Sequence, residues 1–104
     1  MTILNVGREK GMMSQIPIKI EKVEKKLLDR EILRAAIIAE LDAVNLYEQL
    51  AAATTNENIR KVLLEVAREE KTHVGEFQAL LLREDKEQVE ELEKGRKEVE
   101  EITG

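Results

Sequence analysis

The sequence predicts an all-α protein in which two long helices form an antiparallel hairpin. The 104 residues are 38% charged and 2% aromatic, a composition typical of helices rather than of sandwiches or barrels. Pro17 is the single proline, so no proline interrupts a helix in the rest of the chain. Apolar residues also recur at alternating spacings of four and three along two long segments, which is the repeat of helices packed along one seam.

The N-terminal segment differs from the rest of the chain. Residues 1–20 contain two glycines and the proline and show no sustained period, so we expect a flexible, extended arm. Residues 21–104 are expected to form one helical domain, because a chain of this length has room for one core. From about Glu21 to Ala53 the sequence is helical throughout, either as one helix or as a short helix followed by a long one that Asp29 caps.

The second long helix has a start signal in the sequence TTNENI. Thr54 and Glu57 have the spacing of a capping box, in which the two side chains satisfy exposed backbone donors. We therefore expect this helix from near Thr55 to about Arg83.

A third helix is predicted by Asp85 and Gln88, which offer a similar start. It is expected to run through Gly95 to about Glu101. Because this segment is mostly charged, we expect it to be solvated or packed against a neighbouring chain.

Composition excludes several classes of function. There is no cysteine, which excludes disulfide frameworks, zinc ribbons, iron–sulfur clusters and thiol nucleophiles, so any metal must be held by oxygen and nitrogen ligands. With a net charge of -5 and basic residues interleaved with glutamates, no nucleic-acid partner is expected. Apolar runs are too short for a membrane span and the first residues lack a signal-peptide pattern, so a cytoplasmic protein is expected.

The seam of the second long helix contains two polar residues among apolar ones. Glu70 and His73 lie one turn apart, so both side chains can reach one point, and His73 is the only histidine of the chain. The members of this seam are Ile59, Leu63, Val66, Glu70, His73, Phe77 and Leu80.

The first long helix repeats this pattern with a single carboxylate, Glu40, on its seam. Glu40 lies 13 residues before Ala53 and Glu70 lies 13 residues after Glu57, so an antiparallel hairpin places the two at the same height. Three potential ligands therefore converge. The members of this seam are Leu33, Ile37, Glu40, Val44, Tyr47 and Ala51.

A metal site explains these seam residues better than core packing does, because burying an unpaired carboxylate is costly. Most other glutamates, including Glu48 and Glu69, are interpreted as solvated surface. Dimetal carboxylate bundles use one Glu from each of two helices and a Glu-x-x-His from each of two more, whereas this chain supplies one of each. We therefore expect two chains to meet on a twofold axis, each contributing half the site. Their four carboxylates would balance the charge of two divalent metals.

Two segments, AELDAVNLYEQ (Ala39–Gln49) and REEKTHVGEF (Arg68–Phe77), resemble the encapsulated ferritins, which are half-length relatives of ferritin and rubrerythrin. The resemblance covers about residues 29–104. It implies that the domain of residues 21–104 is ferritin-like, and that its hairpin dimerises into a four-helix bundle with an additional C-terminal helix. It also implies a di-iron ferroxidase site, with two Fe per dimer, whose ligands are Glu40, Glu70 and His73.

The same resemblance implies roles for two further residues. Tyr47 matches the tyrosine that stands beside the metals in the family, although a core tyrosine without a metal role is the alternative. Asp42 either guides iron to the site or is an ordinary surface residue. Some relatives carry an aromatic residue and an acid where this chain has Leu46 and Ala39, which weakens the comparison on that face.

The resemblance further implies an open ring, a decameric pentamer of dimers, housed in the cytoplasm within an encapsulin nanocompartment. Many relatives end in a targeting tail, whereas this sequence ends in EEITG. Either such a tail is missing, or the domain is the N-terminal part of a fusion to the shell protein.

Three functions compete at this point. The first is a ferroxidase that oxidises Fe²⁺ with dioxygen or peroxide for iron storage and detoxification, with a rubrerythrin-like peroxidase as its near alternative; the latter is disfavoured because a four-cysteine iron domain is absent. The second is a non-enzymatic metal carrier or scaffold, since the ligands also suit Zn²⁺, Mn²⁺ or Ca²⁺. The third is a structural helical oligomer in which the buried Glu and His fix the register.

Overall fold

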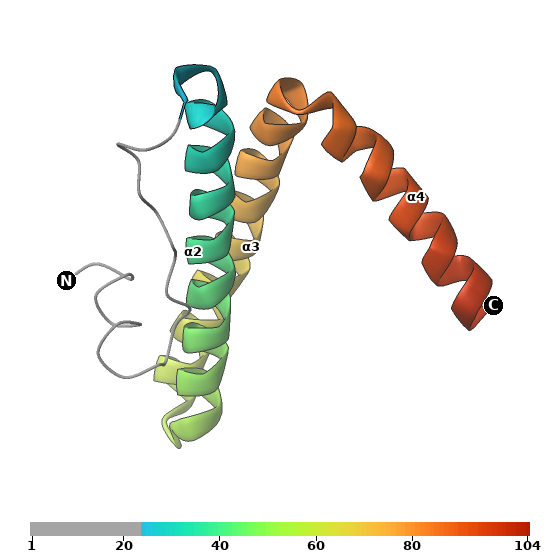
Figure 1. The fold of residues 1–104 in the computed structure, drawn as a ribbon. Coiled ribbons are helices and arrows are strands. Elements are labelled where there is room, and N and C mark those ends of the chain that lie inside the picture. Colours follow the sequence, from blue (N-terminus) through green and yellow to red (C-terminus); the bar gives the residue numbers. More distant parts are fainter. Residues whose placement is uncertain (1–23) are drawn as a thin grey trace.

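The computed structural model describes residues 24–104, and these form three helices without a strand among them (Figure 1). Helix α2 spans Lys25–Ala53, α3 spans Glu57–Glu84 and α4 spans Lys86–Thr103. The predicted all-α class is confirmed. The expected arm over residues 1–20 lies outside the described residues, and so do the first positions of the segment predicted to be helical from Glu21.

Helix α2 is continuous, so the alternative of two helices with a break at Asp29 is wrong. The backbone is extended at Glu24, with φ -60° and ψ 138°, and turns helical at Lys25. Asp29 then lies inside the helix. Asp29 lies beyond the first turn of α2, which holds no acidic residue, and it does not mark a new helix start.

The predicted capping box at the start of α3 is also wrong, because Asn56 caps the helix. The Asn56 side-chain oxygen accepts hydrogen bonds from the backbone N–H groups of Asn58 and Ile59 at 2.9 and 3.1 Å. The Thr54 hydroxyl instead accepts from the N–H of Asn56 at 3.1 Å. Asparagine is as good an N-cap as threonine or better, and the helix consequently begins at Glu57.

Helices α2 and α3 pack side by side as an antiparallel hairpin, as the sequence predicts (Figure 1). Their polar contacts show the register. Arg34 near the start of α2 pairs with Asp85 at the end of α3 at 2.8 Å, whereas Glu48 further along α2 pairs with Lys71 in the middle of α3 at 3.0 Å. Partner numbers thus fall along α3 as they rise along α2.

Small side chains allow the two helices to approach closely. Ala43, at 0% exposed, and Ala67, at 2%, are among the most deeply buried residues. The seam predicted for α3 is displaced from this line, because Ile59 and Leu80 are 49% and 44% exposed while Leu81 is 5% exposed. The predicted seam therefore runs along one edge of the helix contact and leaves an apolar edge open.

The predicted start of α4 is confirmed. One oxygen of the Asp85 carboxylate accepts from the Gln88 N–H at 3.1 Å, and the other accepts from Arg34 of α2 at 2.8 Å. The Gln88 N–H, and after it the Arg34 guanidinium, hold the pKa of Asp85 below its usual value. Arg30 of α2 adds a hydrogen bond to the carbonyl of Glu84 at 2.8 Å.

These contacts of Arg30, Arg34, Asp85 and Gln88 form the joint between the hairpin and α4. Beyond this joint, α4 leads away from the hairpin (Figure 1) and buries none of its residues within the chain. This agrees with the expectation that its charged sequence is solvated or packed against a neighbour. Arg96 pairs along the helix with Glu93 at 2.7 Å and with Glu100. Between residues 24 and 104, no helix combines the length and hydrophobicity that crossing a membrane requires.

Candidate metal centre

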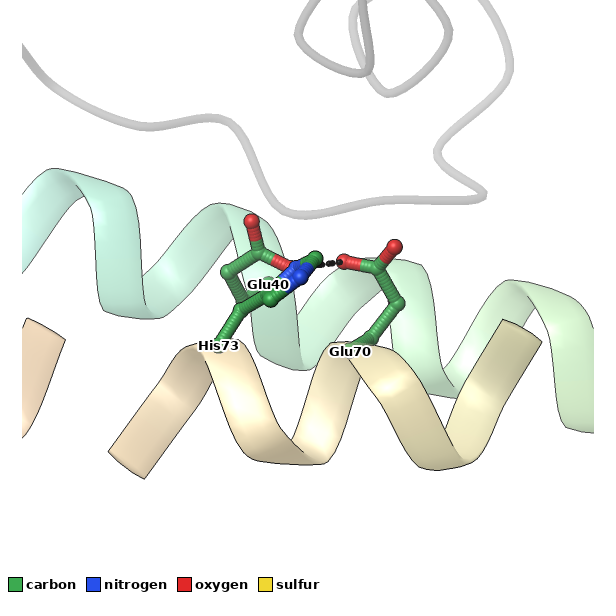
Figure 2. Close-up of side chains that lie close together, drawn as sticks. All are labelled: Glu40, Glu70 and His73. Atoms are coloured by element: carbon green, nitrogen blue, oxygen red, sulfur yellow. Dashed lines mark hydrogen bonds and ion pairs between the residues drawn. The ribbon is translucent and has the colours of Figure 1, made fainter. Parts of the chain in front are cut away.

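The structure brings Glu40, Glu70 and His73 together in the middle of the hairpin (Figure 2). The Nδ1 atom of His73 lies 3.3 Å from Oε2 of Glu40 and 3.4 Å from Oε2 of Glu70. One ligand atom from each residue falls within 4.8 Å of the others. The predicted convergence of these three side chains is therefore confirmed, while their role as ligands stays a prediction.

Each helix positions its share of the group through the hairpin register. Glu70 and His73 lie one turn apart on α3, so their side chains leave the helix on the same face. Glu40 reaches the same point from α2 (Figure 2). Because α2 and α3 are long, continuous helices packed on small residues, the three side chains start from a rigid backbone.

The electrostatics of the group favour a bound cation. The Glu40 and Glu70 side chains are only 18% and 17% exposed, and among the described residues each carboxylate forms its ion pair with His73 alone. Two carboxylates at this separation repel one another when both are charged. One imidazole cannot offset both, so a cation at their meeting point would lower the energy of the site.

The donor set suits a transition metal with mixed oxygen and nitrogen ligands. Carboxylate and imidazole ligands bind iron, manganese and zinc. The ring nitrogen that faces the carboxylates is Nδ1, so this atom is the one placed to bind the same ion. Three protein ligands fill only part of the coordination sphere that such ions adopt, which leaves positions for water, an oxidant or further protein ligands.

The two accessory residues differ in their setting. Tyr47 lies half-buried on α2, two turns beyond Glu40 on the same stripe of the helix. Asp42 is 8% exposed and lies outside the three-residue group. Its burial does not fit the alternative of an ordinary surface residue. The metal-related roles of Tyr47 and Asp42 stay predictions.

One contact near the centre was missed in the sequence. Glu48 was interpreted as solvated surface, but it pairs across the hairpin with Lys71, the residue after Glu70. Both side chains remain substantially exposed, at 44% and 60%. Glu48 lies 5 residues before Ala53 and Lys71 lies 14 residues after Glu57, so the equal-height argument that aligned Glu40 with Glu70 does not predict this pair.

Comparison with known proteins finds relatives with the same helical fold. Residues 31–103 match the family model described as Rubrerythrin. A crystal structure of the encapsulated ferritin domain from Pyrococcus furiosus matches with a TM-score of 0.77 and 59% identity, covering 88% of this chain and 94% of that chain.

Two curated relatives are longer than this chain. It is 69% identical over 74 residues to a ferritin-like-encapsulin shell fusion protein from Pyrococcus furiosus, a match covering 71% of this chain and 21% of that protein. It is 42% identical over 69 residues to the encapsulin nanocompartment cargo protein EncC from Myxococcus xanthus, covering 64% of this chain and 53% of that protein. The matched region thus spans about a fifth of the first relative and about half of the second.

Proposed function

Because the chain belongs to the rubrerythrin family and, within it, to the encapsulated ferritins, we propose that it is a ferroxidase. It oxidises Fe²⁺ to Fe³⁺ at a two-iron site shared by two copies of the chain. The observation that carries this proposal is the convergence of Glu40, Glu70 and His73, in which one imidazole nitrogen faces two carboxylates from two helices.

The open edge of the hairpin supports the sharing of the site between two chains. Ile59, Val62 and Leu80 are 49%, 63% and 44% exposed, and their spacing places them on the same side of α3 as His73. A second hairpin packed on this side would bury these residues. It would also bring a second set of the three ligands, which completes the pattern of two Glu and two Glu-x-x-His known from dimetal bundles.

The chemistry of the ligands suits iron oxidation. Fe²⁺ is the substrate, and the four carboxylates of two chains balance the charge of two such ions. Carboxylates are hard ligands and stabilise the more highly charged ferric state. Two Fe²⁺ ions together supply two electrons. With two protons, these reduce one dioxygen to hydrogen peroxide or one hydrogen peroxide to two waters. Tyr47 is proposed to stand beside the metals, and Asp42 to guide iron toward them.

The names of the relatives support a setting for this activity. They describe a protein fused to an encapsulin shell and an encapsulin cargo protein. We therefore propose that the dimers form a decameric ring within an encapsulin nanocompartment in the cytoplasm, where the oxidised iron is stored. Zn²⁺, Mn²⁺ or Ca²⁺ would bind the same site as substitutes, and of these Zn²⁺ and Ca²⁺ cannot be oxidised.

The direct test adds Fe²⁺ to the purified protein without oxygen and then admits air or hydrogen peroxide. A ferric absorbance should appear much faster than in buffer, and its fast phase should saturate at two Fe per dimer. Comparing the two oxidants identifies the one that the protein uses. If the protein binds Fe²⁺ yet oxidation is no faster than in buffer, the chain is a metal carrier and the ferroxidase proposal is wrong.

A further inference from the structure

Two ion pairs join α2 to α3 and to the residue that follows α3, and both lie along one side of the hairpin. Arg34 pairs with Asp85 at 2.8 Å, and Glu48 pairs with Lys71 at 3.0 Å. Glu48 follows Arg34 by fourteen residues, and Lys71 precedes Asp85 by the same number. Fourteen residues make almost four turns of an α-helix, so the chain returns to the same side. We call these two ion pairs the ties of the hairpin.

The ties lie on either side of the metal centre along the hairpin. Glu40 lies between the two tie residues of α2, which are about 21 Å apart along the helix axis. On the other strand of the hairpin, His73 lies between Lys71 and Asp85. Lys71 precedes His73 by two residues, so their side chains point about 160° apart around α3. The ties therefore hold the two helices together on the side turned away from His73.

Apolar packing between α2 and α3 defines their rotation only weakly. Among the described residues, no large side chain is fully buried. Two of the most deeply buried residues are Ala43 and Ala67, whose methyl groups allow a close approach but are too short to interlock. The rotation of one helix against another is defined by side chains that interdigitate across the contact. Polar contacts at the edge of the hairpin therefore contribute more to this rotation than they would beside a large core.

The metal centre is sensitive to this rotation because its residues come from both helices. Nδ1 of His73 lies 3.3 Å from Oε2 of Glu40 on α2 and 3.4 Å from Oε2 of Glu70 on its own helix. A carboxylate oxygen lies roughly 6 Å from its helix axis, so turning one helix by about 10° moves this oxygen by about 1 Å. Metal–ligand distances tolerate only about 0.2 Å, and a misplacement of about 1 Å can slow a reaction on the order of 100-fold.

The tie formed by Glu48 and Lys71 has little to contribute to the stability of the fold. The two side chains are 44% and 60% exposed, and ion pairs this exposed add little to the free energy of unfolding. A small rotation of the helices would also leave most of their apolar contact in place. Loss of this tie is therefore expected to affect the metal centre more than the folding of the chain.

We propose that Glu48 and Lys71 are positioning residues of the metal centre. Their ion pair, together with the second tie, fixes the rotation of α2 against α3 and so holds Glu40 opposite the two ligands of α3. Neither residue belongs to the three-residue group, so both act through the ligands rather than on the metal. The inference rests on the proposed function only in requiring that the centre binds a metal ion.

The test measures the affinity of the purified protein for Fe²⁺ without oxygen, by calorimetric titration, and the visible spectrum of bound Co²⁺, which reports the arrangement of the ligands. Glu48→Gln and Lys71→Gln should each weaken Fe²⁺ binding about tenfold, as expected for residues that orient metal ligands, and should change the Co²⁺ spectrum. The melting temperature without metal should change little. As a matched control, Glu65→Gln removes an exposed ion pair within α3 and should bind both metals like wild type.

The two single variants separate positioning from simple attraction between charges. Glu48→Gln makes the surroundings of the centre less negative, whereas Lys71→Gln makes them more negative. Through charge alone, the first change would weaken cation binding and the second would strengthen it. Positioning predicts weaker binding in both variants. Unchanged or tighter Fe²⁺ binding by Lys71→Gln would overturn the proposal.

A charge exchange provides the rescue. The double variant Glu48→Lys/Lys71→Glu re-forms the tie with reversed polarity and should restore Fe²⁺ affinity and the Co²⁺ spectrum toward those of wild type. A double variant that binds no better than the single variants would overturn the proposal. Because binding is measured without an oxidant, a chain that binds Fe²⁺ but does not oxidise it refutes the ferroxidase proposal and leaves this comparison valid. A wild-type chain that binds neither ion would refute both.

Discussion

Acidic side chains connect α2 to the rest of the molecule at two places, and their charge is compensated in opposite ways. At the joint before α4, the side chain of Asp85 is 8% exposed and is matched within the chain by Arg34 and the Gln88 N–H. At the metal centre, the side chains of Glu40 and Glu70 are 18% and 17% exposed and share the single imidazole of His73.

This difference separates a structural contact from a binding site. A buried carboxylate with its hydrogen bonds and counter-charge in place requires nothing from outside the chain. Two partly buried carboxylates that share one imidazole leave a deficit of positive charge. The joint is therefore complete in one chain, whereas the metal centre gains stability from a cation and, in our proposal, from a second chain. Four experiments test this difference.

The largest effect is expected from removing a proposed ligand. Glu70→Ala or His73→Ala should slow the fast phase of iron oxidation roughly 100-fold or more, since even residues that only support metal ligands are worth 10–100-fold. Stopped-flow absorbance measures this rate. Glu69→Ala is the matched control, because Glu69 is exposed and outside the three-residue group. Equal losses at Glu69 and Glu70 would show that the wrong carboxylate was assigned.

Metal removal should reveal the charge deficit of the centre. Metal at about 100 times its dissociation constant should stabilise the folded protein by about 2.7 kcal/mol, and a chelator should reverse this and weaken the dimer. The double variant Glu40→Gln/Glu70→Gln should lose the metal response while its metal-free form becomes more stable, because the repulsion between carboxylates is gone. Thermal unfolding with and without metal measures both effects. A metal-free variant less stable than metal-free wild type would argue against repulsion.

At the joint, a smaller loss is expected that does not depend on metal. Arg34→Met should lower the melting temperature by a few degrees, because the largely buried Asp85 oxygen would lose its charged partner. Arg68→Met removes the exposed pair with Glu65 instead and should change the melting temperature little. Calorimetry in the presence of a chelator compares the two. Similar losses in both variants would mean that the burial of Asp85 does not increase the contribution of its ion pair to stability.

The smallest effect concerns the titration of Asp85. Its pKa is lowered chiefly by the Gln88 N–H and then by Arg34, so its contribution to stability is present at neutral pH. That contribution is lost as the pH falls below about 4, the ordinary range of an aspartate, and through the lower folded pKa. Arg34→Met should raise this pKa only in part, since the larger cause remains. Carboxyl carbon NMR of Asp85 measures it, and a return to the ordinary value in the variant would contradict the assigned order of causes.

The sequence could predict the features that depend on residues close together in the chain. Helix class and approximate bounds follow from local periodicity, and Asp85 was identified as a cap because the cap bond to Gln88 spans only three residues. At the turn before α3, two cap candidates, Thr54 and Asn56, stand close together. Only the backbone path around the turn decides between them, so the sequence argument chose the wrong one.

The metal centre was predictable for a similar reason and its surroundings were not. Glu70 and His73 are local neighbours on one helix, and a single antiparallel register then places Glu40 opposite them. The pairing of Glu48 with Lys71 and that of Arg34 with Asp85 depend on how far each side chain lies around its helix from the contact line. The burial of Asp42 has the same origin.

The all-helical class, the hairpin register and the three residues of the candidate centre follow from the sequence alone, because these depend on helical periodicity and on one short connection. Only the packing of the helices decided which residues beside each seam are buried and which are exposed. Packing on Ala43 and Ala67 brings the helices close along one line and leaves Ile59 and Leu80 at an open edge. It also decided the direction of α4, since Arg34 binds the carboxylate of Asp85 that caps this helix. Periodicity cannot specify either feature, because both depend on the rotation of one helix against another, which is set by the shapes of side chains that are distant in the sequence.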